Sequence, residues 1–261
     1  PMSTPRNLRA IPLAGNTATG ALKLIALCFM MIDHMGKMLF PQVPEMRILG
    51  RIAFPLYAWC MVVGFHYTRN PWRYALRILL VGLVSQPLYM VALDHTWHEP
   101  NIFLTLFFAL LALMAVEEKS WERDSLLLRV LGRAGAAVGC ILCLCAAIWF
   151  GCDYGWRGVL LVVLLYAART SRPALAAVMT AFCLYWGTTS GAVVSFFGLP
   201  LRFSGAAGTL LSPWFKTQAL AILALPLMVF PWKRDLRLPA WVGYGIYPAH
   251  LVVLWLLEQL G

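Results

Sequence analysis

Long apolar runs recur along almost the whole sequence, and they constrain the fold more than any other feature. A helix needs about 20 apolar residues to cross the hydrocarbon core of a bilayer. Backbone polar groups in hydrocarbon must find partners within the protein, so such runs fold as helices. The sequence therefore predicts an all-α fold, a polytopic transmembrane helical bundle with about nine spans. The runs cover residues 21–40, 48–66, 74–93, 101–116, 132–150, 157–168, 173–198, 215–231 and 240–259.

Composition excludes a soluble globular domain. Hydrophobic residues make up 61% of the 261 residues and charged residues 12%, whereas a soluble domain has about 25% charged residues. No polar segment is long enough for a second domain. We therefore expect a cytoplasmic N-terminal segment at residues 1–20 and a single transmembrane domain at 21–261. Residues 1–20 lack the apolar core of a signal peptide, so the first span is the expected targeting signal.

The distribution of basic residues predicts the orientation. With a cytoplasmic N-terminus, fifteen of the 21 Lys and Arg residues lie on the inner side, as the positive-inside rule requires. Nine spans then place the C-terminus in the periplasm. The 157–168 run is short, and residues 187–191 are a candidate break in the seventh run. A total of eight or ten spans is therefore an alternative to nine. The net charge of +10 follows from this excess of basic residues in the loops. The sequence has no basic run interleaved with aromatic residues, so no nucleic-acid partner is predicted.

Three ionisable residues stand inside or at the edge of the first two runs: Asp33, His34 and Arg51. Each costs roughly 2.5–3.5 kcal/mol at the centre of a membrane helix, so each needs a reason to be there. The predicted topology places Asn101 and the turn at Asp153 at a similar outer depth. Polar groups from distant parts of the chain thus converge on the outer third of the membrane. This convergence predicts a shared polar cavity.

Helix geometry separates Asp33 from His34. Neighbours in a helix point about 100° apart, so these two side chains do not face each other. Asp33 is expected to pair with Lys37, four residues on, or with a neighbouring span. The partner of His34 must lie on another helix, and the candidates are Asp153, Arg51, Asn101 and Tyr154. Histidine suits general-base work, and the planar fork of Arg51 suits a phosphate or carboxylate.

The last run carries a second polar pair. Tyr247 and His250 are three residues apart and share a helix face, which lines either the same cavity or a packing interface. No metal site is predicted, because neither the Cys140/Cys143 pair nor the His95/His98 pair has further ligands nearby in sequence.

Five sequence blocks resemble TraX-type proteins in order and spacing, from the first run to the last. They are Met31-Ile-Asp-His34, Gly50-Arg-Ile-Ala-Phe-Pro55, Asn101-Ile-Phe, Asp153-Tyr-Gly-Trp-Arg-Gly158 and Tyr247-Pro-Ala-His-Leu251. The resemblance implies a multi-pass acetyltransferase of the bacterial inner membrane. TraX-type proteins acetylate the N-terminal residue of a processed conjugative pilin, with acetyl-CoA as donor, and are distantly similar to membrane acyltransferases that modify envelope sugars.

The resemblance also suggests roles for the candidate residues. His34 would be the general base, Arg51 or Asn101 would stabilise the oxyanion, and Asp153 would orient His34 or bind the pilin ammonium, with Tyr154 beside it. The donor would be bound by residues on the inner side and in the last span: Arg69, Arg73, Arg77, Tyr247 and His250. The expected partners are the pilin subunit and membrane lipids.

Four alternatives to pilin acetylation stay open. They are a pilin-cyclising enzyme that forms an amide without coenzyme A, an O-acyltransferase on an envelope sugar, a non-enzymatic pilin assembly partner, and a small-molecule transporter. The absence of a second, matching broken helix disfavours the transporter.

Overall fold

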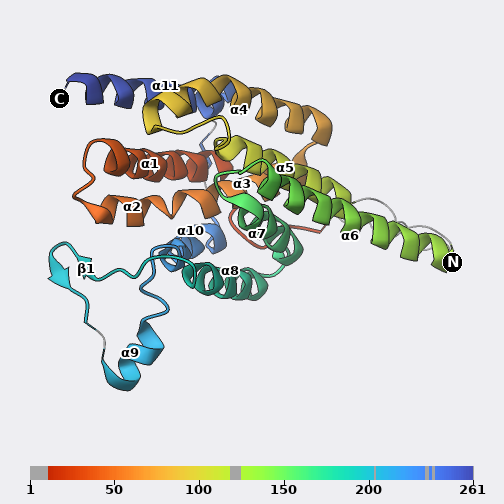
Figure 1. Cartoon of the computed structure of the whole chain (residues 1–261). Coiled ribbons are helices and arrows are strands. Elements are labelled where there is room, and N and C mark those ends of the chain that lie inside the picture. The colour runs from red at the N-terminus through yellow and green to blue at the C-terminus, as the bar shows by residue number, and fades with distance from the viewer. Residues whose placement is uncertain (1–10, 118–124, 203, 233–234, 237–238, 261) are drawn as a thin grey trace.

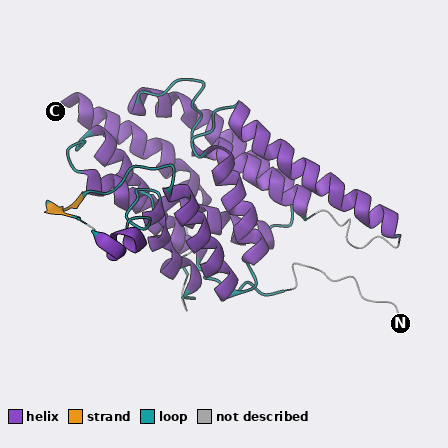
Figure 2. Ribbon diagram, turned by 60° about the horizontal axis from the view of Figure 1, so that its bottom comes forward, coloured by secondary structure: helices purple, strands orange, loops and turns teal. Residues whose placement is uncertain are grey.

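The computed structural model describes residues 11–117, 125–202, 204–232, 235–236 and 239–260. The chain is 72% helical with almost no strand, which confirms the all-α prediction (Figures 1 and 2). The elements are α1 (Thr19–Met38), α2 (Pro44–Gly50), α3 (Ala53–Tyr67), α4 (Pro71–Leu93), α5 (Ile102–Val116), α6 (Leu126–Trp149), α7 (Gly155–Ala168), α8 (Arg172–Gly187), β1 (Ser195–Phe196), β2 (Leu199–Pro200), α9 (Gly205–Leu211), the 3₁₀ helix η3 (Ala219–Ala224), α10 (Leu225–Val229) and α11 (Ala240–Leu260).

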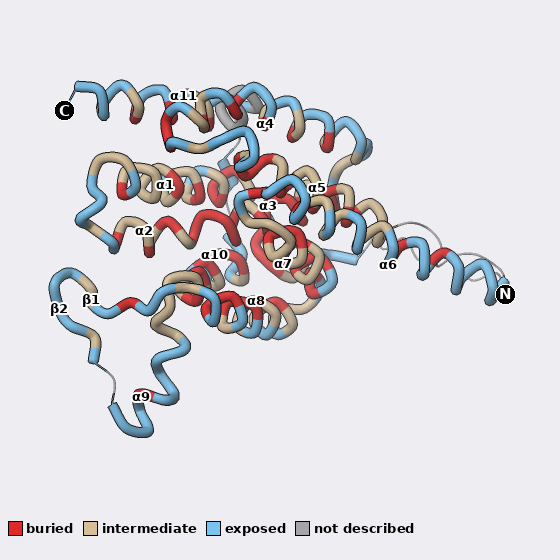
Figure 3. The backbone as a smooth tube through the Cα atoms, viewed as in Figure 1, coloured by how far each residue is buried: buried red, intermediate tan, exposed pale blue. Residues whose placement is uncertain are grey.

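The helix α3 lies at the centre of the bundle. It packs against α1, α5, α7 and η3, and most of its side chains are buried, as the burial colouring of Figure 3 shows. A helix that is apolar on every side belongs in such a position. The helix α6 is the opposite case, because Leu127, Leu142 and Trp149 are exposed. An exposed apolar face of this kind is typical of a helix that contacts lipid.

Four helical segments are long and apolar enough to cross a membrane by length and composition. Shorter apolar helices form much of the rest of the bundle, so the span count of nine and the orientation of the termini stay predictions. The four segments are Thr19–Met38, Pro44–Tyr67, Pro71–Leu93 and Leu126–Trp149.

The second predicted run is interrupted. Its helix breaks at 51–52, between α2 and α3. Pro55 explains the break, because proline has no N–H to donate and its ring crowds the carbonyl four residues earlier, at Arg51. The break turns the start of the span and directs Arg51 toward α1.

The seventh predicted run is shorter than expected. The helix α8 ends at Gly187, where the hydroxyls of Thr188, Thr189 and Ser190 donate to carbonyls of the last turn. The candidate break at 187–191 is therefore real. Beyond it, the β1–β2 hairpin and α9 project from the helical body (Figure 1).

The described part of the N-terminal segment packs against the bundle. Asn16 is fully buried, and its backbone carbonyl accepts a hydrogen bond from Nε1 of Trp59 at 2.7 Å. Its side chain donates to the carbonyl of Leu227 at 3.0 Å. These contacts tie the start of α1 to α3 and α10. Residues 1–10 lie outside the described part of the chain.

Candidate active site

Asp33 is the centre of an ion-pair cluster between α1 and α2. Its Oδ1 accepts from Nη2 of Arg51 at 2.5 Å, and its Oδ2 accepts from Nη1 of Arg47 at 2.9 Å. The side chains of Asp33 and Arg51 are only 13% and 12% exposed, so removing either would leave a largely buried charge without its partner. Of the two partners predicted for Asp33, the neighbouring span is the one observed.

Lys37 is held elsewhere. Its ammonium donates to the carbonyl of Leu93 at 2.8 Å and lies 2.9 Å from Nε2 of His95. The predicted Asp33–Lys37 pair is therefore wrong. The reason is geometric, because the turn between α1 and α2 places Arg47 of α2 and Arg51, which directly follows α2, against the carboxylate. The end of α4 offers Lys37 a free carbonyl.

Gly50 allows the close approach of α2 to Asp33. A Cβ at Gly50 would overlap Cβ, Cγ and Oδ1 of Asp33. We expect Gly50→Ala to displace Asp33 from Arg51 and to lower the free energy of unfolding by about 1–3 kcal/mol, the usual cost of overpacking. Thermal melting of the purified protein in detergent measures this loss.

Gly135→Ala is the matched control for that substitution. A Cβ at Gly135 would meet nothing within 4 Å, and alanine is favoured over glycine inside a helix by about 0.5–1 kcal/mol. A Gly50→Ala protein that melts at or above the temperature of Gly135→Ala would contradict the proposed overlap.

His34 finds its partner on the last helix. Its Nδ1 lies 2.8 Å from Nε2 of His250, and the two rings are nearly parallel at 11° with centroids 5.1 Å apart. None of the four predicted partners of His34 forms this bond, so that prediction is wrong. The two histidines are 216 positions apart in the chain, and packing of α11 against α1 brings them together.

The hydrogen bonds of His250 assign the protonation of both neutral rings. Nδ1 of His250 lies 3.2 Å from the carbonyl of Ile246, which only accepts, so Nδ1 carries the proton. Nε2 of neutral His250 is then an acceptor, and Nδ1–H of His34 donates to it. We infer that Nε2 of His34 carries a free lone pair, which is the form a general base requires.

His34 and the Asp33 cluster line a small cavity of about 150 Å³, and Asp153 and Tyr154 line it too. Tyr154 is fixed by stacking on Phe54, with centroids 3.9 Å apart. Asp153 has no hydrogen bond or ion pair to another residue within the described ranges. Four of the predicted catalytic residues and Tyr154 thus meet at one cavity, hereafter the small cavity.

A loop at 94–100 borders the small cavity. His95 lines the cavity and stacks on Tyr89 at 4.7 Å. Its Nδ1 lies 3.4 Å from Oε2 of Glu99. The backbone N–H of Thr96, together with His95, lowers the pKa of the exposed Glu99 carboxyl below its ordinary value. His95 therefore closes one side of the cavity.

Asn101 lies outside both cavities described here. Its Oδ1 accepts from the backbone N–H of Phe103 at 3.0 Å and caps α5. Its Nδ2 donates to the carbonyl of Gly82 at 2.8 Å and to Oε1 of Gln86 at 2.9 Å. The side chain is buried and fully used, so it joins α4 to α5 and has no donor left for a substrate.

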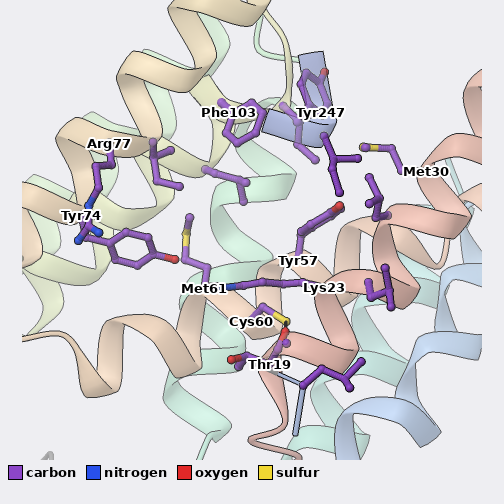
Figure 4. Close-up of a pocket in the computed structure, with 18 of the residues that line it drawn as sticks. Thr19, Lys23, Met30, Tyr57, Cys60, Met61, Tyr74, Arg77, Phe103 and Tyr247 are labelled. Atoms are coloured by element: carbon purple, nitrogen blue, oxygen red, sulfur yellow. Dashed lines mark hydrogen bonds between the residues drawn. The ribbon is translucent and has the colours of Figure 1, made fainter. Parts of the chain in front are cut away.

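A large cavity of about 450 Å³ lies on the predicted inner side (Figure 4). This volume falls within the range of about 300–1,000 Å³ that is usual for ligand sites. Lys23 and Tyr57 point into its centre, and Tyr74 and Arg77 lie at one side. In the described chain, the Lys23 ammonium has no hydrogen bond or ion pair. Asp235 also lines the cavity and accepts from the backbone N–H groups of Gly20 and Ala21.

The two cavities meet at four side chains that line both of them. These four residues, hereafter the junction, are Met30, Tyr57, Ile102 and Tyr247.

The helix α1 runs along both cavities. Lys23 and His34 are 11 residues apart, which is about three turns and about 16 Å of helix, so both lie on one face. Met30 of the junction lies between them on the same face. One face of α1 therefore presents a cation, Lys23, to the large cavity and a candidate base, His34, to the small cavity.

The predicted donor-binding residues divide into three groups. Arg77 and Tyr247 line the large cavity. Arg69 and Arg73 are exposed and line neither cavity. His250 binds His34. Lys23 was missed, although its position 11 residues before His34 is a signal for a shared helix face.

The fold and the site define a helical bundle with membrane-length helices and two cavities that share four lining side chains, one of them lined by a histidine and an Asp–Arg cluster. The model of the family described as TraX protein matches residues 18–258. The chain belongs to the TraX family.

Two curated proteins are similar to part of the chain. A probable fimbrial assembly protein FimC, serogroup H1, from Dichelobacter nodosus is 34% identical over 107 residues, which cover 36% of this chain and 44% of the relative. The uncharacterized protein RP591 from Rickettsia prowazekii (strain Madrid E) is 34% identical over 86 residues, which cover 33% of this chain and 32% of the relative. The chain thus spans less than half the length of both relatives. No solved structure matches.

Proposed function

We propose that this protein is an acyltransferase of the bacterial inner membrane that acetylates the N-terminal amine of a processed pilin subunit, with acetyl-CoA as donor. Membership of the TraX family and the similarity to a fimbrial assembly protein support a role in pilus biogenesis. The observation that carries the proposed chemistry is the junction between the two cavities. It allows a donor from one side to meet an acceptor from the other beside His34.

The large cavity suits the donor. Lys23 and the guanidinium of Arg77 bring positive charge to it, and both groups bind phosphates well. Arg69 and Arg73 are exposed at the start of α4 and add positive charge on the predicted cytoplasmic side. The acyl-pantetheine arm would then extend past Lys23 to the junction and place the thioester next to His34.

The small cavity suits the amine acceptor. Asp33 is already neutralised by two arginines, so Asp153 is the carboxylate left to attract the pilin ammonium. The bound ammonium releases one proton to the solvent and becomes the neutral amine before it attacks. Asp153 is therefore proposed as the acceptor-binding residue and Tyr154 as part of the wall beside it.

The proposed reaction is a direct acyl transfer. The amine nitrogen attacks the thioester carbon, and Nε2 of His34 accepts a proton from the attacking nitrogen. The carbon–sulfur bond then breaks, and the coenzyme A thiolate leaves and takes up that proton, which yields the amide and free coenzyme A. The oxyanion is stabilised by the positive field of three cations that line the small cavity, Arg47, Arg51 and Lys37. Asn101 is not assigned this role, because its side-chain N–H groups are already bonded to Gly82 and Gln86.

His250 is expected to position His34. We expect His250→Phe to lower kcat by about tenfold to a hundredfold, because Nδ1–H of His34 loses its acceptor and the tautomer with a basic Nε2 is no longer selected. KM for acetyl-CoA should change little, since His250 lines neither cavity. A variant that loses donor affinity with kcat unchanged would contradict the positioning role.

Intact-mass analysis of the cognate pilin tests the proposed function. Pilin from cells that contain this protein should carry one added acetyl group, and pilin from cells that lack it should not. A loss of one water would indicate cyclisation instead. An unchanged pilin mass together with failed pilus assembly would indicate a non-enzymatic assembly partner.

A further inference from the structure

We propose that the junction selects the acyl group, and that it restricts this enzyme to acyl donors of two or three carbons. The inference rests on the proposed acyl transfer and adds the residues that set the length of the acyl chain. Met30, Tyr57, Ile102 and Tyr247 line both cavities. An acyl group that arrives from the large cavity must pass between these side chains to reach His34.

The junction is closely packed. Met30, Ile102 and Tyr247 are at most 8% exposed. The ring of Tyr247 lies edge-on to Phe103, at 90° with centroids 4.8 Å apart, and packs against His250 at 5.3 Å. Side chains held on several sides do not move aside freely, because protein interiors are close-packed and resist compression.

The small cavity limits what can lie beyond the junction. Its volume of about 150 Å³ equals that of about five liquid water molecules. The acceptor amine and the acyl group must share this space. An acetyl group adds a single methyl beyond the carbonyl, whereas a hexanoyl group adds a chain of five carbons. One methylene too many discriminates by about 10–200-fold in a fitted pocket.

Ile102 is the junction residue whose position is best defined. It begins α5, directly after Asn101. Asn101 caps that helix and is bonded to Gly82 and Gln86 of α4. These bonds fix the first turn of α5, and with it the branched side chain at the junction. This explains a buried, fully hydrogen-bonded asparagine next to the site: it positions a selectivity residue.

Leu106 offers a matched control. It lies four residues after Ile102 on the same face of α5 and is also buried, but it lines only the large cavity. Ile102→Ala and Leu106→Ala therefore remove similar apolar volume from one helix. Only Ile102→Ala widens the passage to His34.

The experiment compares acetyl-, propionyl-, butyryl- and hexanoyl-CoA as donors for the purified full-length protein. The acceptor is a peptide with the N-terminus of the processed pilin, and mass spectrometry gives kcat/KM for each donor. The wild-type protein should prefer acetyl over butyryl by tenfold or more. Ile102→Ala should reduce this preference by about tenfold, and Leu106→Ala should leave it unchanged. Met30→Ala provides a second widened junction if Ile102→Ala does not fold.

Two results would overturn the selectivity and leave acyl transfer standing. One is a wild-type protein that uses acetyl and hexanoyl donors equally well. The other is a junction variant with the same donor preference as Leu106→Ala. A wild-type protein that transfers no acyl group from any of the four donors would overturn the proposed function itself.

Discussion

Replacing His34 by alanine is expected to lower acetyl transfer by about 10²–10⁴-fold and to leave the protein folded. The loss follows because, among the residues that the structure describes, His34 is the only histidine that lines the small cavity with a free Nε2. His98→Ala is the matched control, because His98 is exposed in the 94–100 loop and lines neither cavity. It should retain wild-type activity.

Two further measurements separate a base from a packing residue at position 34. Added imidazole should partly restore transfer by His34→Ala, since the vacated space adjoins the small cavity. His34→Ala and His98→Ala should melt within a few degrees of each other. Full activity in His34→Ala would show that this side chain is not the base.

Replacing Asp33 by alanine is expected to lower the free energy of unfolding by about 3–5 kcal/mol, the cost of breaking a buried ion pair by removing one partner. Arg51 would remain largely buried without its carboxylate. Arg47 would lose Oδ2 as an acceptor and keep only the backbone carbonyl of residue 33. Thermal or denaturant-induced unfolding in detergent measures the loss.

Two comparisons sharpen the Asp33 prediction. Glu258→Ala removes an exposed carboxylate from α11 and should change stability by less than about 0.5 kcal/mol. Asp33→Asn retains the volume and one acceptor, so it should fall between Glu258→Ala and Asp33→Ala. A melting temperature for Asp33→Ala equal to that of Glu258→Ala would show that the cluster does not hold α2 to α1.

Much of the fold could be predicted from local pattern. The apolar runs gave most helices within a few residues, because the run length needed in a bilayer is a strong constraint. The sequence carries weaker signals for the β1–β2 hairpin and for the helix break at 51–52. The hairpin has two residues per strand, and Pro55 tells where a helix is disturbed without telling how far the chain turns.

The candidate site was predicted in part. The predicted depth along the membrane grouped Asp33, His34, Arg51 and Asp153, and all four line the small cavity. Depth says nothing about which helices are neighbours, so the bond between His34 and His250 was missed. Asn101 has the right depth and chemistry for a site residue, but the carbonyl of Gly82 and the side chain of Gln86 occupy it. Such competition between partners is visible only in three dimensions.

The most direct test of the central claim is the sidedness of transfer. The purified protein is reconstituted into sealed liposomes with the acceptor peptide trapped inside, and acetyl-CoA is added outside. We predict acetylation of the trapped peptide, and its loss in His34→Ala, because donor and acceptor enter from opposite sides and meet at the junction. Acetylation that occurs only when donor and acceptor are on the same side of the membrane would contradict the account.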